Sequence, residues 1–312
     1  MVYLRGTFLI VSLLHSKKEN KTKEAMKKFL LLFGALTVTM CAVAGYQLSR
    51  GANRGPVSIT YNGSESEGEE DIIIKGDAPK KRESRTVTPF HTIVTGMAIN
   101  VNYTAASNYS LVVEADNRVL DNVKTEVRDG VLYITYTGKV TIRNSNQTTI
   151  HLTGRDLRKV RASTSSDVVL NMAKSSPLSE FSMDIASAAT VVFDHIYADE
   201  VNIELASTAS IIGEIRDAQK VDIDLSSASE LTLSGNCHTL RVDASSSSEA
   251  DLENLKAVVA NVDASSAASV TVWVSESLTA DASSAADILY RGEQGLTIDA
   301  DASSASTIGR LR

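Results

Sequence analysis

A short motif of small residues recurs about every 20 residues through the C-terminal half of the chain. Each copy reads apolar, charged, apolar and then four small residues, as in Val262-Asp-Ala-Ser-Ser-Ala-Ala. A unit of this length cannot bury its apolar face alone, so neighbouring copies must stack on one another. Eight copies, spaced 18 to 23 residues apart, begin at Val160, Met183, Ile203, Ile223, Val242, Val262, Ala280 and Ala300.

The pattern within one copy indicates a β-strand that runs into a bend. Alternating apolar and charged residues are typical of a strand with one face inward, and four small residues fit a tight corner. Leucine-rich repeats have a similar length, but their Leu-x-x-Leu-x-Leu frame is missing, and a propeller blade needs about twice the period. We therefore predict an all-β fold. Over residues 160–312 it is a single-stranded parallel β-helix (β-solenoid) of right-handed form, with about eight ~20-residue repeats.

Residues 85–159 carry strand signals without the repeat, and they predict an irregular β-rich N-terminal part of the same domain. Arg128-Asp129-Gly130 is typical of a tight hairpin in which glycine supplies a positive φ. No apolar period of 3.6 residues supports a helix. The expected strands are Phe90–Val94, Ala98–Tyr103, Ser110–Ala115, Val123–Val127, Val131–Tyr136 and Thr149–Leu152.

The first 44 residues predict export. Lys27 and Lys28 precede the apolar run Phe29–Met40, and the small residues Ala42-Val-Ala44 follow, which is the pattern of a signal peptide. The apolar run is shorter than the ~20 residues of a membrane span, so an uncleaved anchor is the weaker alternative. Met26 is the more natural start, which makes residues 1–25 an upstream extension. We expect the mature protein in the periplasm, or in the outer membrane or at the cell surface, of a Gram-negative bacterium.

The two cysteines bear on anchoring and stability. Cys41 would be the lipidated residue of a lipoprotein, but Met40 before it is bulkier than the residue usual at that position. Cleavage after Ala44 would leave Cys237 as the single cysteine, so no internal disulfide could form. Stability would then come from burial and backbone pairing.

Composition after the signal peptide favours basic or cationic partners. Residues 1–44 hold seven Lys and Arg against two Glu, so residues 45–312 carry 24 basic and 36 acidic side chains, a net charge of −12. Such a surface repels phosphate backbones and lacks the aromatic platforms that stack bases, which excludes nucleic-acid binding. Residues 45–84, with glycines and runs of charge, are expected to form a linker, either a flexible tether or one bearing an edge strand.

The second position of the repeat is acidic in seven consecutive copies, which predicts a ladder of carboxylates on one face. Like charges ~5 Å apart repel by about 1 kcal/mol each in water, so cations or basic groups would stabilise the stack. One hypothesis is therefore binding of a divalent cation such as calcium. The alternative is a solvated face that deters aggregation, since the Asp-x-Asp-x-Asp-Gly calcium loop is missing. The ladder comprises Asp184, Glu204, Asp224, Asp243, Asp263, Asp281 and Asp301.

A matching row of hydroxyl residues occupies the corner. None of them lies in a Gly-x-Ser-x-Gly elbow, and their repetition favours a structural role over a catalytic one. We expect them to be small because stacked bends leave little space and because hydroxyls bond local backbone. This corner ladder comprises Thr164, Ser187, Ser207, Ser227, Ser246, Ser266, Ser284 and Ser304.

The order of motifs from Phe90 onward resembles the family of putative autotransporter adhesin head domains (GIN domain). Phe90-His-Thr-Ile-Val-Thr-Gly, Val112-Glu-Ala-Asp, Asp129-Gly-Val-Leu-Tyr-Ile and Ala282-Ser-Ser-Ala-Ala-Asp-Ile-Leu-Tyr-Arg-Gly carry the likeness, which covers residues 85–312. The resemblance implies a β-helix in the bacterial cell envelope and a role in adhesion. Members of the family usually place glycine at the corner, where this chain has Ser or Ala.

These observations favour a non-enzymatic envelope module, without a cofactor, that presents an acidic face to a glycan or protein. The alternative is a polysaccharide-processing enzyme on the same scaffold. Histidines 91, 151, 195 and 238 show no metal-ligand spacing, and no basic partners converge on the repeated acids, so we predict no catalytic residue. Self-association is a third hypothesis, because the repeat around Ile308 has no evident cap and leaves a strand edge.

Overall fold

We describe the fold from a computed structural model, which describes residues 59–60, 72–75, 78–138, 140–143, 147–172 and 177–311. The chain divides into two units, Met1–Gly55 and Pro56–Arg312, and all described residues belong to the second. The predicted signal peptide, Met26, Cys41 and most of the predicted linker lie outside the described residues. Among the described residues, none forms a helix that is long and apolar enough to cross a membrane.

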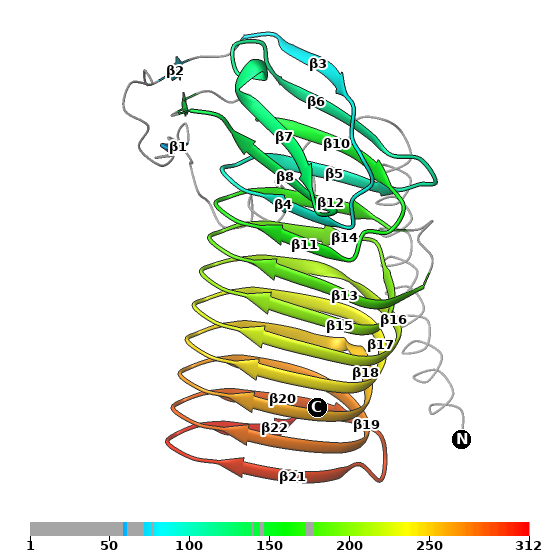
Figure 1. Ribbon diagram of the computed structural model, residues 1–312. Coiled ribbons are helices and arrows are strands. Elements are labelled where there is room, and N and C mark those ends of the chain that lie inside the picture. Colours follow the sequence, from blue (N-terminus) through cyan, green and yellow to red (C-terminus); the bar gives the residue numbers. More distant parts are fainter. Residues whose placement is uncertain are drawn as a thin grey trace, which may run out of the picture. The chain divides into compact units, whose positions relative to one another are not determined.

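The repeats form a β-solenoid of stacked coils, as the sequence predicts (Figure 1). Each strand pairs in parallel with its equivalent in the next coil. From Ser210 onward a single long strand often runs through both a side and a bend of the coil. The strands are β11 (Lys159–Ala162), β12 (Asp167–Asn171), β13 (Leu178–Ile185), β14 (Thr190–Phe193), β15 (Ile196–Leu205), β16 (Ser210–Leu225), β17 (Glu230–Ala244), β18 (Glu249–Ala264), β19 (Ser269–Ala282), β20 (Asp287–Gly292), β21 (Thr297–Ala302) and β22 (Thr307–Arg310).

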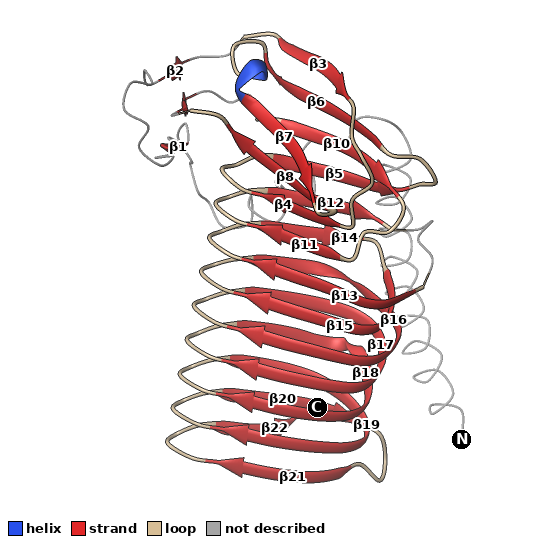
Figure 2. Cartoon of the chain, in the orientation of Figure 1, coloured by secondary structure: helices blue, strands red, loops and turns tan. Residues whose placement is uncertain are grey.

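An irregular layer, in which antiparallel and parallel strand pairs are mixed, covers the N-terminal end of the stack (Figure 2). Its strands are β3 (Lys80–Arg85), β4 (Thr92–Thr95), β5 (Asn100–Ala105), β6 (Ser110–Asp116), β7 (Val123–Arg128), β8 (Val131–Tyr136) and β10 (Thr149–Gly154), with one 3-10 turn, η1 (Leu120–Asn122). Antiparallel pairing joins β3 to β6, β6 to β10 and β7 to β8. Separately, β1 (Ile59–Thr60) and β2 (Ile72–Lys75) pair with β9 (Val140–Arg143).

The parallel stack begins within this layer, where β8 pairs in parallel with β4 and β10 pairs in parallel with β5. β4 pairs in parallel with β11, and β5 pairs in parallel with β12. The predicted hairpin joins β7 and β8, and its residues Asp129 and Gly130 have φ values of 50° and 75°. Lys80-Lys-Arg82, which composition places in the linker, lies in β3 and pairs with β6.

The interior of the solenoid consists of columns of small and β-branched side chains. In one such column, Ile203, Ile223 and Val242 are at most 1% exposed and occupy equivalent places in successive coils. Every coil adds one side chain to each column, so the apolar face of one coil is covered by the next. The thin core explains how the chain folds with only 5% aromatic residues.

The predicted small-residue clusters form the corners on one side of the solenoid. At each, two consecutive non-glycine residues have φ between 52° and 63°. In one corner the Ser248 N–H donates to the Ser245 carbonyl at 3.3 Å, and the Ser247 N–H donates to the Ser266 carbonyl of the next coil at 3.0 Å. Each corner is therefore a tight left-handed turn whose amides continue the ladder between coils.

Glycine is required at the bends on the other side. Gly235 has φ of 112°, and a Cβ there would lie 1.8 Å from the Ile215 carbonyl oxygen. A Cβ on Gly213 would lie 2.2 Å from the Phe193 ring. At these two positions the missing side chain lets neighbouring coils approach.

Candidate functional site

Parallel pairing turns the acidic position of the repeat into a continuous ladder in space. Asp224 lies beside Asp243, Asp243 beside Asp263, and Asp263 beside Asp281. The ladder continues to Glu204 and Asp184 on one side and to Asp301 on the other. All seven predicted residues are thus brought together in one column, about one strand spacing (~4.8 Å) apart.

This ladder forms one wall of a groove of about 970 Å³ that follows the corners along the solenoid. From Asp184 to Asp281, the residue that follows each acid is buried and forms part of the lining, as Leu225 does after Asp224. The small first residue of each corner supplies another row of the lining. That row comprises Ser163, Ala186, Ala206, Ser226, Ser245, Ser265, Ser283 and Ser303.

The carboxylates in the middle of the ladder are held close to one another with little compensation. Partial burial and the charge of Asp243 raise the pKa of Asp224. Partial burial and the charges of Asp243 and Asp281 raise the pKa of Asp263. Both shifts mean that the ionised ladder is electrostatically destabilised, so a bound positive charge would stabilise it.

Basic residues of the chain neutralise only part of the ladder. At its upper end, the Arg161 Nε and the Lys159 Nζ lie 2.7 and 3.0 Å from the Asp184 carboxylate. Burial of Asp184 acts against these contacts, but the hydrogen bonds from Arg161 and Lys159 prevail and lower its pKa. Arg241 Nη2 lies 2.7 Å from Asp243. Within the described residues, no ion pair involves Glu204, Asp224, Asp263, Asp281 or Asp301.

The predicted corner ladder lies one residue beyond the groove lining. Its members, Thr164 through Ser304, occupy the first of the two positive-φ positions, and their side chains are exposed. Limited space is therefore not what keeps them small. The crowded position comes two residues later, where Ser166, Ala209 and Ser248 are at most 1% exposed. There the Ser248 hydroxyl lies 3.5 Å from the Leu225 carbonyl of the preceding coil.

The described residues contain no group of three or more His, Cys, Asp or Glu side chains arranged to hold a metal ion. Calcium takes six to eight oxygen ligands, and two neighbouring carboxylates of the ladder offer at most four. A calcium ion in this groove would therefore need oxygens from a ligand or from water as well. Carboxylate oxygens are suitable ligands for calcium, but carboxylates in a single column do not surround the ion.

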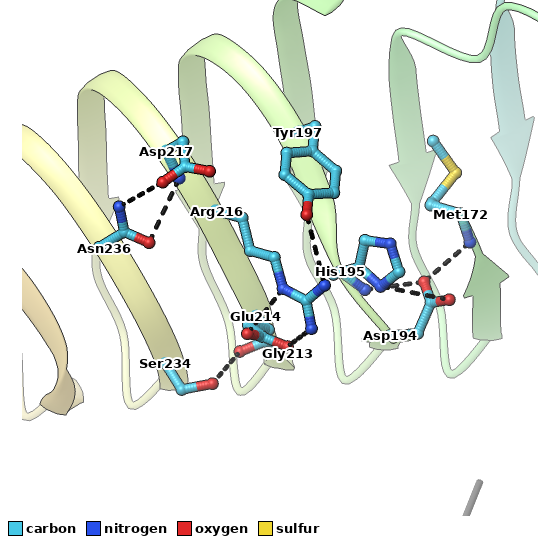
Figure 3. A network of polar contacts seen from close by, with 10 residues as sticks. All are labelled: Met172, Asp194, His195, Tyr197, Gly213, Glu214, Arg216, Asp217, Ser234 and Asn236. Atoms are coloured by element: carbon cyan, nitrogen blue, oxygen red, sulfur yellow. Dashed lines mark hydrogen bonds and ion pairs between the residues drawn. The ribbon is translucent and has the colours of Figure 1, made fainter. Parts of the chain in front are cut away.

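Figure 3 shows a second network of polar contacts, which runs from Met172 and residues 194–195 through β15 and β16 to β17. The Arg216 guanidinium donates two hydrogen bonds to Glu214, at 2.8 and 2.7 Å, and lies 5.8 Å from the centre of the Tyr197 ring. Glu214 and then Tyr197 raise the pKa of Arg216. His195 packs edge-on against Tyr197. The charge of Arg216 is paired with Glu214 in the same strand, and its contact with Tyr197 joins β16 to β15 in the adjacent coil. The network therefore stabilises the packing of neighbouring coils.

The remaining reactive side chains are poorly placed for catalysis. Cys237 is buried, and that burial raises the pKa of its thiol to about 12, so it is not a nucleophile at neutral pH. His91 contacts Thr92, and His151 lies 3.4 Å from Glu114. His238 is exposed. Among the described residues, those that line the groove include no histidine, cysteine or aromatic residue, and Arg161 is the single basic one.

Comparison with known proteins agrees with this architecture. Residues 89–293 match the family model described as "Putative auto-transporter adhesin, head GIN domain". Among curated proteins, no sequence matches the chain. Structures described as a "putative adhesin" from Parabacteroides merdae (TM-score 0.71, 15% identity) and from Parabacteroides distasonis (0.71, 16%) each cover 77% of this chain and 100% of their own.

A third structure, a "Putative lipid binding protein" from Parabacteroides distasonis, has a TM-score of 0.66 at 15% identity and covers 78% of this chain and 100% of its own. At these identities the structural likeness shows a shared fold. What those proteins bind is a separate matter from what this groove binds.

Proposed function

Since the chain belongs to the family described as "Putative auto-transporter adhesin, head GIN domain", we propose that it is an exported, non-enzymatic binding module of the cell envelope. Its acidic groove would hold an extended, positively charged polymer lengthwise. The family model and the adhesin-like neighbours support a binding role at the envelope. The predicted signal peptide supports export.

One observation carries the choice of ligand: a continuous column of carboxylates lines a groove, and the described basic residues pair with only two of its seven acids. A linear polymer lying along the solenoid axis would meet one carboxylate about every 4.8 Å. Amino-sugar polymers and polyamines carry positive charge at regular, short intervals. They therefore fit the periodicity better than a single compact ligand does.

Affinity in such a groove would come from many weak contacts. An exposed ion pair contributes about 0.2–1 kcal/mol, so tight binding requires several carboxylates to act together on one ligand. Binding should also be sensitive to salt, because the Debye length falls from ~10 Å at 0.1 M to ~3 Å at 1 M. A long, multiply charged ligand is preferred to a short one for the same reason.

A polysaccharide-processing enzyme is less well supported. Glycoside hydrolysis uses two carboxyl groups in different environments, one to donate a proton and one to attack or to activate water. The carboxylates in the ladder repeat on one wall, so no such opposed pair flanks a bond lying in the groove. Turnover of a polysaccharide by the purified protein would contradict the proposal.

The direct test compares glucosamine oligomers, which carry free amines, with N-acetylated oligomers of the same length. We expect calorimetry to show binding of the glucosamine oligomers that weakens with salt and no binding of the acetylated ones. Replacing Asp224 and Asp263 with Asn should weaken binding at least about tenfold. The matched pair Glu249→Gln and Asp287→Asn removes the same charge from outside the groove lining and should leave affinity within about twofold.

The same titrations are repeated with calcium and with EDTA. Equal binding of both oligomers, or binding unaffected by the groove pair, would contradict a cationic ligand. Binding of the acetylated oligomer only when calcium is present, and its loss with EDTA, would show instead that the groove recruits a neutral glycan through bridging ions. The mature N-terminus and protease accessibility on whole cells would test export and the side of the outer membrane.

A further inference from the structure

At the lower end of the solenoid, β21 is the lowest of the described strands (Figure 1). β21 pairs with β19 along one edge, and β22 pairs in the same way with β20. Within residues 59–311 as described, no strand pairs with the other edge of either. A strand edge with free N–H and C=O groups is a template for another strand.

Apolar side chains that are covered in every upper coil are uncovered at this edge. Ile298 is 40% exposed, whereas Leu278, its equivalent in the coil above, is fully buried. Ala300 and Ala302 are likewise exposed, whereas Ala280 and Ala282 above them are not. An added strand would therefore gain apolar burial as well as backbone hydrogen bonds.

The direction of the backbone groups identifies the free donors. The Ser303 N–H donates to the Ala282 carbonyl of the coil above at 2.9 Å. Since backbone groups of successive strand residues point to opposite edges, Asp299 and Asp301 also bond upward. The N–H and C=O groups of Ala300 and Ala302 consequently face the open edge.

The charges next to this edge select the kind of strand that fits. Asp299 and Asp301 project from β21 beside the free backbone groups and are exposed. The opposite end of the acidic ladder shows which strand such acids accept. There β11 places Lys159 and Arg161 against Asp184 while Val160 and Ala162 point into the core.

A second copy of the chain fits less well. Antiparallel pairing of two β21 strands about Ala300 would set Asp299 of each copy opposite Asp301 of the other. Like charges directly opposite across two strands are destabilising. The same two acids that attract a basic strand thus oppose self-association at neutral pH.

We propose that the open edge of β21 binds an extended segment of another protein, in which apolar residues alternate with Lys or Arg, as an additional β-strand. Main-chain hydrogen bonds to Ala300 and Ala302 supply affinity. Asp299 and Asp301 select basic side chains on the outer face, and Ile298 takes the apolar ones on the inner face. The site shares Asp301 with the lower end of the groove, whereas Ile298, Asp299 and Ala300 lie outside the groove lining, so edge binding does not depend on what the groove binds.

The test uses a labelled peptide with two copies of the β11 sequence Lys-Val-Arg-Ala and measures its binding to the purified protein by fluorescence anisotropy. Replacing Ala300 with Pro removes an N–H that faces only the open edge, so it should weaken binding about tenfold. Ala300→Thr keeps the N–H and should bind normally. Asp299→Asn with Asp301→Asn should also weaken binding, as should a peptide with Glu in place of its basic residues.

Two further measurements separate the edge from the groove and from dimerisation. The groove pair Asp224→Asn and Asp263→Asn should leave peptide affinity within about twofold. Both side chains lie at least two coils above β21, and salt screens most of their charge over that distance. Loss of peptide binding in the groove pair, with normal binding in Ala300→Pro, would overturn the proposal in favour of the groove. Sedimentation showing stable dimers that Ala300→Pro abolishes would overturn it in favour of a second copy.

Discussion

Two substitutions in the acidic ladder should change stability in opposite directions, although both replace an Asp with an Asn. Asp263 lies between Asp243 and Asp281 in the register, and no ion pair among the described residues involves it. Asp184 stands at the end of the ladder and is held by Arg161 and Lys159. We expect Asp263→Asn to stabilise the solenoid at pH 7 and Asp184→Asn to destabilise it.

The magnitude follows from the strand spacing. Two unit charges ~4.8 Å apart in water repel by about 0.9 kcal/mol, so two neighbours cost about 1.7 kcal/mol. Arg241 attracts Asp263 and offsets part of this repulsion. A net gain of about 1 kcal/mol is expected for Asp263→Asn at low salt, falling to roughly half at 0.15 M salt. Asp184→Asn should cost about 0.5–1 kcal/mol, the range for ion pairs near the surface.

The pH dependence separates the two effects. The pKa of Asp263 is raised in the folded state, so its destabilisation is complete well above that pKa and disappears as pH falls toward the unfolded pKa of about 3.9. The pKa of Asp184 is lowered, so its stabilisation is complete above about 3.9 and is lost only below it. Between neutral pH and pH 4, the advantage of Asp263→Asn should shrink while the deficit of Asp184→Asn persists.

Urea unfolding followed by fluorescence of Trp273, the single tryptophan, gives both free energies of unfolding at each pH and salt concentration. A destabilised Asp263→Asn protein at pH 7 would refute the reasoning, because it would mean that the carboxylate has a stabilising partner. So would an effect that is the same at 0.02 and 1 M salt. Equal pH profiles for the two variants would show that position in the ladder does not matter.

Three further predictions follow from the positive φ values at the bends and from the burial of Cys237. Ser266→Gly should raise the melting temperature, with a gain of up to about 1 kcal/mol, because glycine adopts the positive φ of the corner without strain. Gly235→Ala should destabilise the protein by more than about 2 kcal/mol, whereas Gly295→Ala, also at positive φ but facing open space, should cost clearly less in the same melts. Peptide mapping by mass spectrometry should find Cys237 alkylated by iodoacetamide only after unfolding, and rapid labelling of the native protein would contradict its burial.

The repeat made the solenoid and its ladders predictable from sequence. In a parallel stack with one register, residues at equal positions of the repeat become neighbours in space. The aligned positions Asp224, Asp243 and Asp263 therefore form one column of side chains. The alternation of apolar residues likewise identified the inward face. No comparable rule exists for the strands before Lys159, where antiparallel and parallel pairs are mixed and each partner must be found separately.

The groove and the corner conformation were not predictable in the same way. Sequence shows that four small residues occur together, but not which of them faces solvent, and Ser266 is exposed while Ala268 is buried. Two successive non-glycine residues at positive φ would not be chosen from intrinsic preference. Hydrogen bonds to the next coil hold the corner in this conformation, and those bonds exist only once the stack has formed.

The left-handed corners make each coil an interchangeable unit of length. The Ala267 N–H bonds to the Ser284 carbonyl just as the Ala285 N–H bonds to the Ser304 carbonyl, both at 3.0 Å, so an inserted coil would find the same partners above and below. Duplication of one repeat would lengthen the groove by about 4.8 Å and add one carboxylate without rebuilding the core. Avidity for a polymeric ligand could therefore be adjusted during evolution by the number of coils, with no change in the chemistry of any one of them.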